Sequence, residues 1–201
     1  MSDTTVGCGA TVQRVNVLVI GAAKTGTTVI SKTIQHSSPG ADYHVEPKEL
    51  KFFENEDRAA LTNPQVVKII FEHWVDRPRM RNALIHNEAK LKFDHVVCIV
   101  RDLRDEMLSR MLYLSYGEAE SHGFDHARMA NWRSLLETKE TAPAEVSFVS
   151  LLDGYRRIWG RGPSVEDLIK FARPYRSFLD RHAEAITLVR YEDFMLSLIH
   201  I

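Results

Sequence analysis

The stretch Val15–Thr33, which reads V-N-V-L-V-I-G-A-A-K-T-G-T-T-V-I-S-K-T, decides the fold. Its β-branched run from Val15 predicts a strand, the segment between Gly21 and Gly26 predicts a tight loop, and the apolar spacing that follows predicts a helix. Such a unit presents backbone N–H groups and a helix N-terminus to an anion, and Lys24 adds a full positive charge. The sequence therefore predicts an anion site at this loop.

The position of the lysine distinguishes this loop from that of a nucleotide triphosphatase. A triphosphatase loop carries its lysine directly after the second glycine, followed by a Ser or Thr that holds magnesium. Here Thr27 occupies that position, and Lys24 lies inside the loop. The usual arrangement of magnesium and terminal phosphates is therefore not expected. The structural alternative is a glycine turn that only packs a strand on a helix.

A candidate general base lies in the segment that follows. Residues 43–45 predict a short strand that ends at Pro47. Glu49 comes shortly before the aromatic pair Phe52 and Phe53. A carboxylate beside an apolar pair can be partly desolvated, which raises its pKa and makes it a better proton acceptor near neutral pH. The structural alternative is a solvated charged turn whose two aromatic rings belong to the core.

A second candidate anion site follows the apolar run 95–100, which predicts a strand buried on both faces. This strand ends at Arg101, and Asp102 is placed to cap a helix. Ser109 lies about two helical turns further, on the same edge as the strand-to-helix turn. Arg101 and Ser109 could then close on one compact, doubly charged group. Taken singly, Ser109 could face solvent and Arg101 could pair with Asp105.

Four separated motifs resemble the sulfotransferase family, whose members use 3′-phosphoadenosine 5′-phosphosulfate. K-T-G-T-T at residues 24–28 is similar to the family's 5′-phosphosulfate loop, and E-L-K-F-F at 49–53 to the segment that supplies the base in carbohydrate-type members. Arg101 with Ser109 eight residues later resembles the 3′-phosphate site. R-Y-E-D-F at 190–194 resembles a strand and acidic turn near the end of the family's core.

The resemblance implies a role for each matched residue. The 5′-phosphosulfate group would be held by the loop residues Ala23, Lys24, Thr25, Gly26, Thr27 and Thr28. Lys24 would neutralise charge on the leaving phosphate, and Arg101 and Ser109 would bind the 3′-phosphate. Glu49 would take the proton of the acceptor, with Glu46 and His44 as alternative bases. The co-substrate would be 3′-phosphoadenosine 5′-phosphosulfate, and no metal is expected in this family.

The expected fold is a three-layer α/β/α domain with a central parallel sheet of the P-loop nucleotide-binding type, spanning residues 14–201 after a flexible leader at 1–13. Within it, residues 63–74 predict a helix that covers a sheet face, residues 115–144 predict an irregular polar segment, and residues 186–190 predict a buried strand. In the family a further helix and a basic glycine-containing loop follow, so the chain is expected to be truncated at its C-terminus.

Composition limits the partners. The 201 residues carry a net charge of −1, which argues against a dominant nucleic-acid or membrane surface. Two cysteines cannot build a disulfide framework, which favours a reducing, cytoplasmic compartment. No apolar run is long enough to span a bilayer. The expected partner is a small-molecule or carbohydrate acceptor. A small-molecule kinase and a non-catalytic nucleotide-binding domain remain the alternatives.

Overall fold

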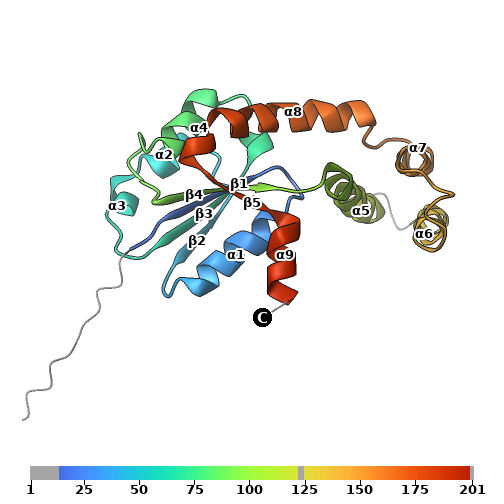
Figure 1. Ribbon diagram of the computed structural model, residues 1–201, viewed down its shortest axis with the longest axis horizontal. Coiled ribbons are helices and arrows are strands. Elements are labelled where there is room, and N and C mark those ends of the chain that lie inside the picture. The colour runs from blue at the N-terminus through green and yellow to red at the C-terminus, as the bar shows by residue number, and fades with distance from the viewer. Residues whose placement is uncertain (1–13, 122–124, 200–201) are drawn as a thin grey trace, which may run out of the picture.

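The computed structural model describes residues 14–121 and 125–199, so the leader expected at 1–13 lies outside the described residues. Five strands form one all-parallel sheet in the order β2-β3-β1-β4-β5 (Figure 1). The strands are β1 (Val17–Gly21), β2 (Asp42–Val45), β3 (Gln65–Ile70), β4 (His95–Val100) and β5 (Thr187–Arg190). Because β1 lies between β3 and β4, its exit loop is at the middle of the sheet edge.

Helices cover both faces of the sheet, which confirms the expected α/β architecture. The α-helices are α1 (Thr27–Ser37), α2 (Leu50–Phe53), α3 (Glu56–Ala59), α4 (Pro78–Ile85), α5 (Leu103–Ser121), α6 (His126–Thr141), α7 (Phe148–Trp159), α8 (Val165–Arg181) and α9 (Tyr191–Ile199), with short 3-10 turns η1 (Phe71–Trp74) and η2 (Ala183–Ala185).

The alternation of side chains along β1 builds a separate core on each face. Val17 and Val19 pack with Ile30 of α1 on one face, where α9 also lies. Leu18 and Ile20 belong to the larger core on the other face, beneath α4 and α8 (Figure 1). The whole strand is buried, because in a parallel sheet helices cover both faces.

Residues 65–70 form a strand, so the helix expected over 63–74 was wrong. β3 pairs with β1 on one side and β2 on the other. Its apolar residues, Val66, Val67 and Ile69, are buried on both faces of the sheet. In so short a run, the spacing of these residues fits a helical stripe as well as a doubly buried strand, and β-branched composition favours the strand.

The polar segment 115–144, expected to be irregular, is mostly helical. α5 continues to Ser121, and α6 begins after Asp125, whose side chain caps it by accepting the Arg128 N–H. α5, α6 and α7 share a second small core away from the sheet (Figure 1), where the rings of Trp132 and Tyr155 lie 5.1 Å apart. Few side chains of α6 are buried, so its sequence lacks the apolar stripe that signals a helix.

β5 is a strand as expected, but it is not buried. It pairs only with β4 among the described residues and therefore forms an edge of the sheet. Leu188 is 54% exposed, whereas Val189, which faces α9, is half-buried. The strand thus has apolar side chains that the described part of the chain does not bury.

Candidate functional site

The loop between β1 and α1 requires glycine at both ends. A Cβ on Gly21 would lie 2.5 Å from Cγ2 of Thr27, and one on Gly26 would lie 2.2 Å from the Tyr191 ring. Gly26 also has a φ of 93°, in the left-handed region that favours glycine. These close approaches explain locally why the sequence places its two glycines five residues apart.

Lys24 holds its backbone in an unusual conformation. Three non-glycine residues in the described ranges have positive φ, and two of them, Lys24 at 73° and Glu46 at 51°, belong to this site. Such backbone strain costs on the order of 1–3 kcal/mol per residue and tends to concentrate at functional sites. The conformation is stabilised by Thr25, whose N–H and hydroxyl both donate to the Ala22 carbonyl, at 3.2 and 2.7 Å.

The N-terminus of α1 completes the loop. The helix begins at Thr27, and its capping residue, Gly26, provides no side-chain hydrogen bond. The first N–H groups of the helix therefore lack a capping side chain, and they carry the partial positive charge of the helix dipole. Thr27 is buried and Thr28 is exposed. This end of the helix can accept an anion.

The Lys24 side chain lies against α5 rather than against a carboxylate. Its Nζ lies 3.1 Å from the centroid of the Tyr113 ring. Burial lowers the pKa of the Lys24 ammonium, and the positive charges of Arg110 and Lys68 lower it further. Repulsion from the two neighbouring cations disfavours the charged form of Lys24, and a bound anion would offset this repulsion.

Lys68 is a functional candidate that sequence reasoning missed, because it was assigned to a helix. From β3 its Nζ donates to Thr28 Oγ1 at 3.0 Å and pairs with Glu46 Oε1 at 2.7 Å. Only 7% of the Lys68 side chain is exposed. A lone lysine inside the β-branched run V-V-K-I-I was the signal that could have found it, since a buried charge needs a specific partner.

Arg101 lies beside the loop. Because β1 and β4 are adjacent and in register at Gly21 and Ile99, their ends form neighbouring corners of the sheet. Arg101 Nη1 donates to the Lys24 carbonyl at 3.1 Å, and its guanidinium stacks 4.6 Å from the centroid of the Tyr191 ring. Of the second predicted anion site, Arg101 is thus in direct contact with the loop.

Ser109 lies further along α5 and makes no direct contact with Arg101. Its side chain is half-buried, and its hydroxyl has no hydrogen-bond partner among the described residues. Ser109 is one turn before Tyr113, so both lie on the edge of α5 that meets Lys24. As expected, Asp102 caps this helix, accepting the Arg104 N–H at 2.8 Å.

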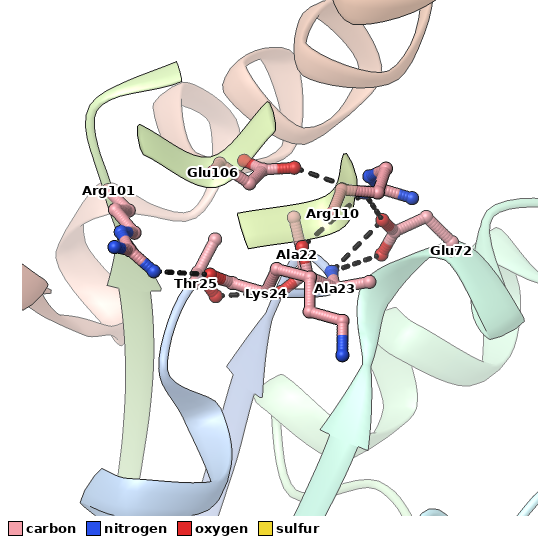
Figure 2. A network of polar contacts seen from close by, with 8 residues as sticks. All are labelled: Ala22, Ala23, Lys24, Thr25, Glu72, Arg101, Glu106 and Arg110. Carbon is pink, nitrogen blue, oxygen red and sulfur yellow. Dashed lines mark hydrogen bonds and ion pairs between the residues drawn. The ribbon is translucent and has the colours of Figure 1, made fainter. Parts of the chain in front are cut away.

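One backbone N–H of the loop already donates a hydrogen bond to a carboxylate (Figure 2). Both oxygens of Glu72 accept the Ala23 N–H at 3.0 Å. Arg110 Nη2 pairs with Glu72 and with Glu106, at 3.1 Å each. Burial raises the pKa of Glu106, against the opposing effect of Arg110. This network fixes the start of the loop from the side of η1 and α5.

Glu49 was expected to have a raised pKa, and this expectation was wrong. It precedes α2 with 63% of its side chain exposed, and it pairs with Lys51 at 2.5 Å. The hydrogen bond and charge of Lys51 lower the pKa of Glu49. Phe53 is buried, but the backbone turns the carboxylate of Glu49 toward solvent, so the aromatic pair does not desolvate it.

The two alternative bases lie in different surroundings. Glu46 approaches the loop through Lys68, and one of its oxygens lies 3.6 Å from His73 Nδ1. His44 instead contacts Gln65 at 2.8 Å and Arg58 at 3.1 Å, and in the described part of the chain no hydrogen bond or ion pair joins it to the loop. Of the two, Glu46 is therefore the one connected to the anion site.

Comparisons with known proteins find similarity to a solved structure. No protein-family model matches the chain, and no curated protein matches it. The chain is similar to the crystal structure of a sulfotransferase from Alicyclobacillus acidocaldarius, with 16% sequence identity and a TM-score of 0.47. The match covers 93% of this chain and 77% of that one.

Within residues 14–121 and 125–199, no helix combines the length and hydrophobicity that crossing a bilayer requires. The same residues bring together no group of three or more His, Cys, Asp or Glu side chains that could hold a metal ion.

Proposed function

We propose that this chain is a sulfotransferase that transfers the sulfuryl group of 3′-phosphoadenosine 5′-phosphosulfate to a hydroxyl or amine. The observation that carries the proposal is the contact between the Lys24 carbonyl and Arg101, at the adjacent ends of β1 and β4; it supports the interpretation of these two strand ends as neighbouring anion-binding corners. A nucleotide with a phosphate at each end needs two such corners. A lone triphosphate tail needs one corner and a metal-binding carboxylate at the end of the second strand, where this chain has Arg101.

The residues of the loop would bind the 5′-phosphate end. Thr27, Thr28 and the loop amide of Gly26 would donate hydrogen bonds, aided by the dipole of α1, whereas the amides of Ala23 and Thr25 already donate to Glu72 and to the Ala22 carbonyl. Lys24 would neutralise the charge that develops on the phosphate oxygen as its bond to sulfur breaks. Electrostatic stabilisation of the charge that develops in the transition state is usually the largest single contribution to rate enhancement.

Three further side chains would complete the donor site. Lys68 would support the loop from beneath by holding the Thr28 hydroxyl and by adding a second positive charge. Arg101 and Ser109 would bind the 3′-phosphate, an arginine fork and a hydroxyl being a suitable set of donors for a dianion. Arg101 would have to exchange its hydrogen bond to the Lys24 carbonyl for the ligand, or share it.

Glu49 would take the acceptor proton while the acceptor oxygen or nitrogen forms its bond to sulfur. The Glu49 carboxylate is 63% exposed and so is accessible to an acceptor, but its hydrogen bond and ion pair with Lys51 lower its pKa and make it a weaker base than an unpaired carboxylate. Glu49→Gln should reduce transfer of labelled sulfate to a panel of alcohols, phenols and amines by about 10²–10⁴-fold. The affinity for 3′-phosphoadenosine 5′-phosphate should stay unchanged, and Glu54→Gln is the matched control. Loss of transfer in Glu46→Gln alone would assign the base to Glu46 instead.

Calorimetric titration tests the nucleotide. The chain should bind 3′-phosphoadenosine 5′-phosphate, and should bind adenosine 5′-phosphate and ATP with magnesium much more weakly. Arg101→Gln should weaken bisphosphate binding by about 10–100-fold, the value of a charge-assisted hydrogen bond, and should remove the preference for a 3′-phosphate. Arg104→Gln is the control, because its side chain is 73% exposed and, among the described residues, pairs only with Asp102. Tight binding of ATP with magnesium and none of the bisphosphate would refute the proposal.

A further inference from the structure

A large cavity lies behind the start of α5, on the face of the sheet that α8 covers. Its volume is about 760 Å³, and its walls come from α5, α8 and the ends of β4 and β5. This volume falls in the range of pockets that hold a small organic ligand. The wall is predominantly apolar, and the Glu106 and Arg110 side chains lie at the end near the loop.

Several large apolar side chains of the wall are left uncovered. Leu103, Ile169, Phe171 and Leu188 all line the cavity and are 43%, 47%, 44% and 54% exposed. Contiguous apolar surface of this kind is costly in water and usually marks a binding site. The cavity therefore has the wall of a site for an apolar molecule.

Two arginines of the cavity wall have no charged partner among the described residues. Arg176 pairs with Asp180 at 2.9 Å, and Arg110 pairs with Glu106. Arg173 and Arg190 also line the cavity and are exposed, and neither has a polar partner among the described residues. Two uncompensated guanidinium groups beside an apolar cavity complement an anionic group on an apolar body.

The helical geometry of α5 separates this cavity from most of the proposed donor site. Leu103 and Met107 face the cavity. Ser109 is two residues beyond Met107 and therefore projects about 200° around the helix from it, on the edge where Tyr113 meets Lys24. A nucleotide that spans Lys24 and Ser109 would lie on the other side of α5, with Thr25 and Arg101 contributing to both sites.

We propose that the cavity binds an amphipathic anion, whose hydrocarbon or aromatic body fills the apolar part and whose carboxylate, sulfonate or phosphate group pairs with Arg173 and Arg190. This site is additional to the donor site, and its existence does not depend on the proposed sulfuryl transfer. The acceptor of the reaction and a separate regulatory ligand share this chemistry.

Titration calorimetry with dodecanoate, below its micelle concentration, tests the site. We expect one dodecanoate per chain, bound at least tenfold more tightly than dodecyltrimethylammonium, which has a similar tail and the opposite charge. The double variant Arg173→Gln/Arg190→Gln should lose at least tenfold in affinity. Arg133→Gln is the control, because this side chain is 81% exposed on α6 and pairs with Glu137.

Methyl NMR of the unmodified chain locates the ligand without relying on a variant that must fold. Signals of Ile169 and Leu188 should shift on addition of dodecanoate, and those of Val66, buried in the sheet, should not. Saturating 3′-phosphoadenosine 5′-phosphate should leave dodecanoate affinity within about threefold. Three results would overturn the proposal: no binding of dodecanoate, equal affinity for the cationic amphiphile, or full competition by the bisphosphate.

Discussion

Lys68 provides the sharpest test of the site, because its ammonium connects the loop to its counterion. Lys68→Met keeps the length of the side chain but removes the bonds to Thr28 at 3.0 Å and to Glu46 at 2.7 Å. Breaking a fully buried ion pair costs about 3–5 kcal/mol. Since 23% of the Glu46 side chain is exposed, it stays partly hydrated, and we expect a loss of about 2–3 kcal/mol.

This loss corresponds to a decrease in melting temperature of about 4–12 °C for a chain of this size. Urea unfolding of Lys68→Met, Glu46→Gln and the double variant should give a coupling free energy of about 2 kcal/mol. Lys90→Met is the control and should cost less than about 1 kcal/mol, because within the described ranges the Lys90 side chain forms only an exposed pair with Glu56.

The same variants separate a structural role of Lys68 from a role in anion binding. Lys68→Met should weaken 3′-phosphoadenosine 5′-phosphate binding about tenfold or more, because the Thr28 hydroxyl loses its support and the site loses a charge. Glu46→Gln should preserve or strengthen binding, because Lys68 then keeps its charge without a competing carboxylate. Additive destabilisation, or unchanged affinity in Lys68→Met, would refute this reasoning.

Three other predictions concern the loop and its surroundings. Gly26→Ala should destabilise the chain by about 2–3 kcal/mol in urea unfolding, because of its φ of 93° and the clash with Tyr191, and Tyr191→Ala should restore only the part due to the clash. Ser109→Ala should lower the preference for 3′-phosphoadenosine 5′-phosphate over adenosine 5′-phosphate by about tenfold in competitive titrations, whereas Ser134→Ala should not change it. Burial and neighbouring cations lower the pKa of Lys24 in the free chain, and a bound anion should raise it. Bisphosphate binding should therefore take up protons at alkaline pH, detected as a dependence of the calorimetric heat on the buffer, and Lys24→Arg should abolish this uptake.

The parts of the fold predicted from sequence are those with strong local signals. The segment 15–33 contains its own strand pattern, glycines and helix pattern, and the strand 95–100 ends abruptly at Arg101. Both units formed as predicted, because the strand pattern, the glycines and the helix pattern that signal each unit lie within a few residues of one another. Their contact through Arg101 followed from a general property of parallel sheets, whose strand ends meet at one edge.

The missed parts depend on partners far away in the chain. β3 is a strand because β1 and β2 flank it, which a short run of mixed spacing does not reveal. The orientation of Lys68 toward Thr28 and Glu46 then depends on three separate elements. The prediction of a raised pKa for Glu49 failed for a similar reason. Adjacency to aromatic residues in the sequence does not determine whether the backbone directs the carboxylate toward them or toward solvent.

The charges around the loop explain why Lys24 is the group prepared for a ligand. Three cations influence one another there, and Glu46 pairs with Lys68 while Glu72 pairs with Arg110. Lys24 has no carboxylate partner among the described residues and rests on the face of the Tyr113 ring. Over the ranges that the structure describes, the Lys24 ammonium is held by a cation–π contact and not by an ion pair. An incoming anion can therefore pair with Lys24 without breaking a salt bridge. The two carboxylates thus satisfy the supporting cations and leave one positive charge for the bound group.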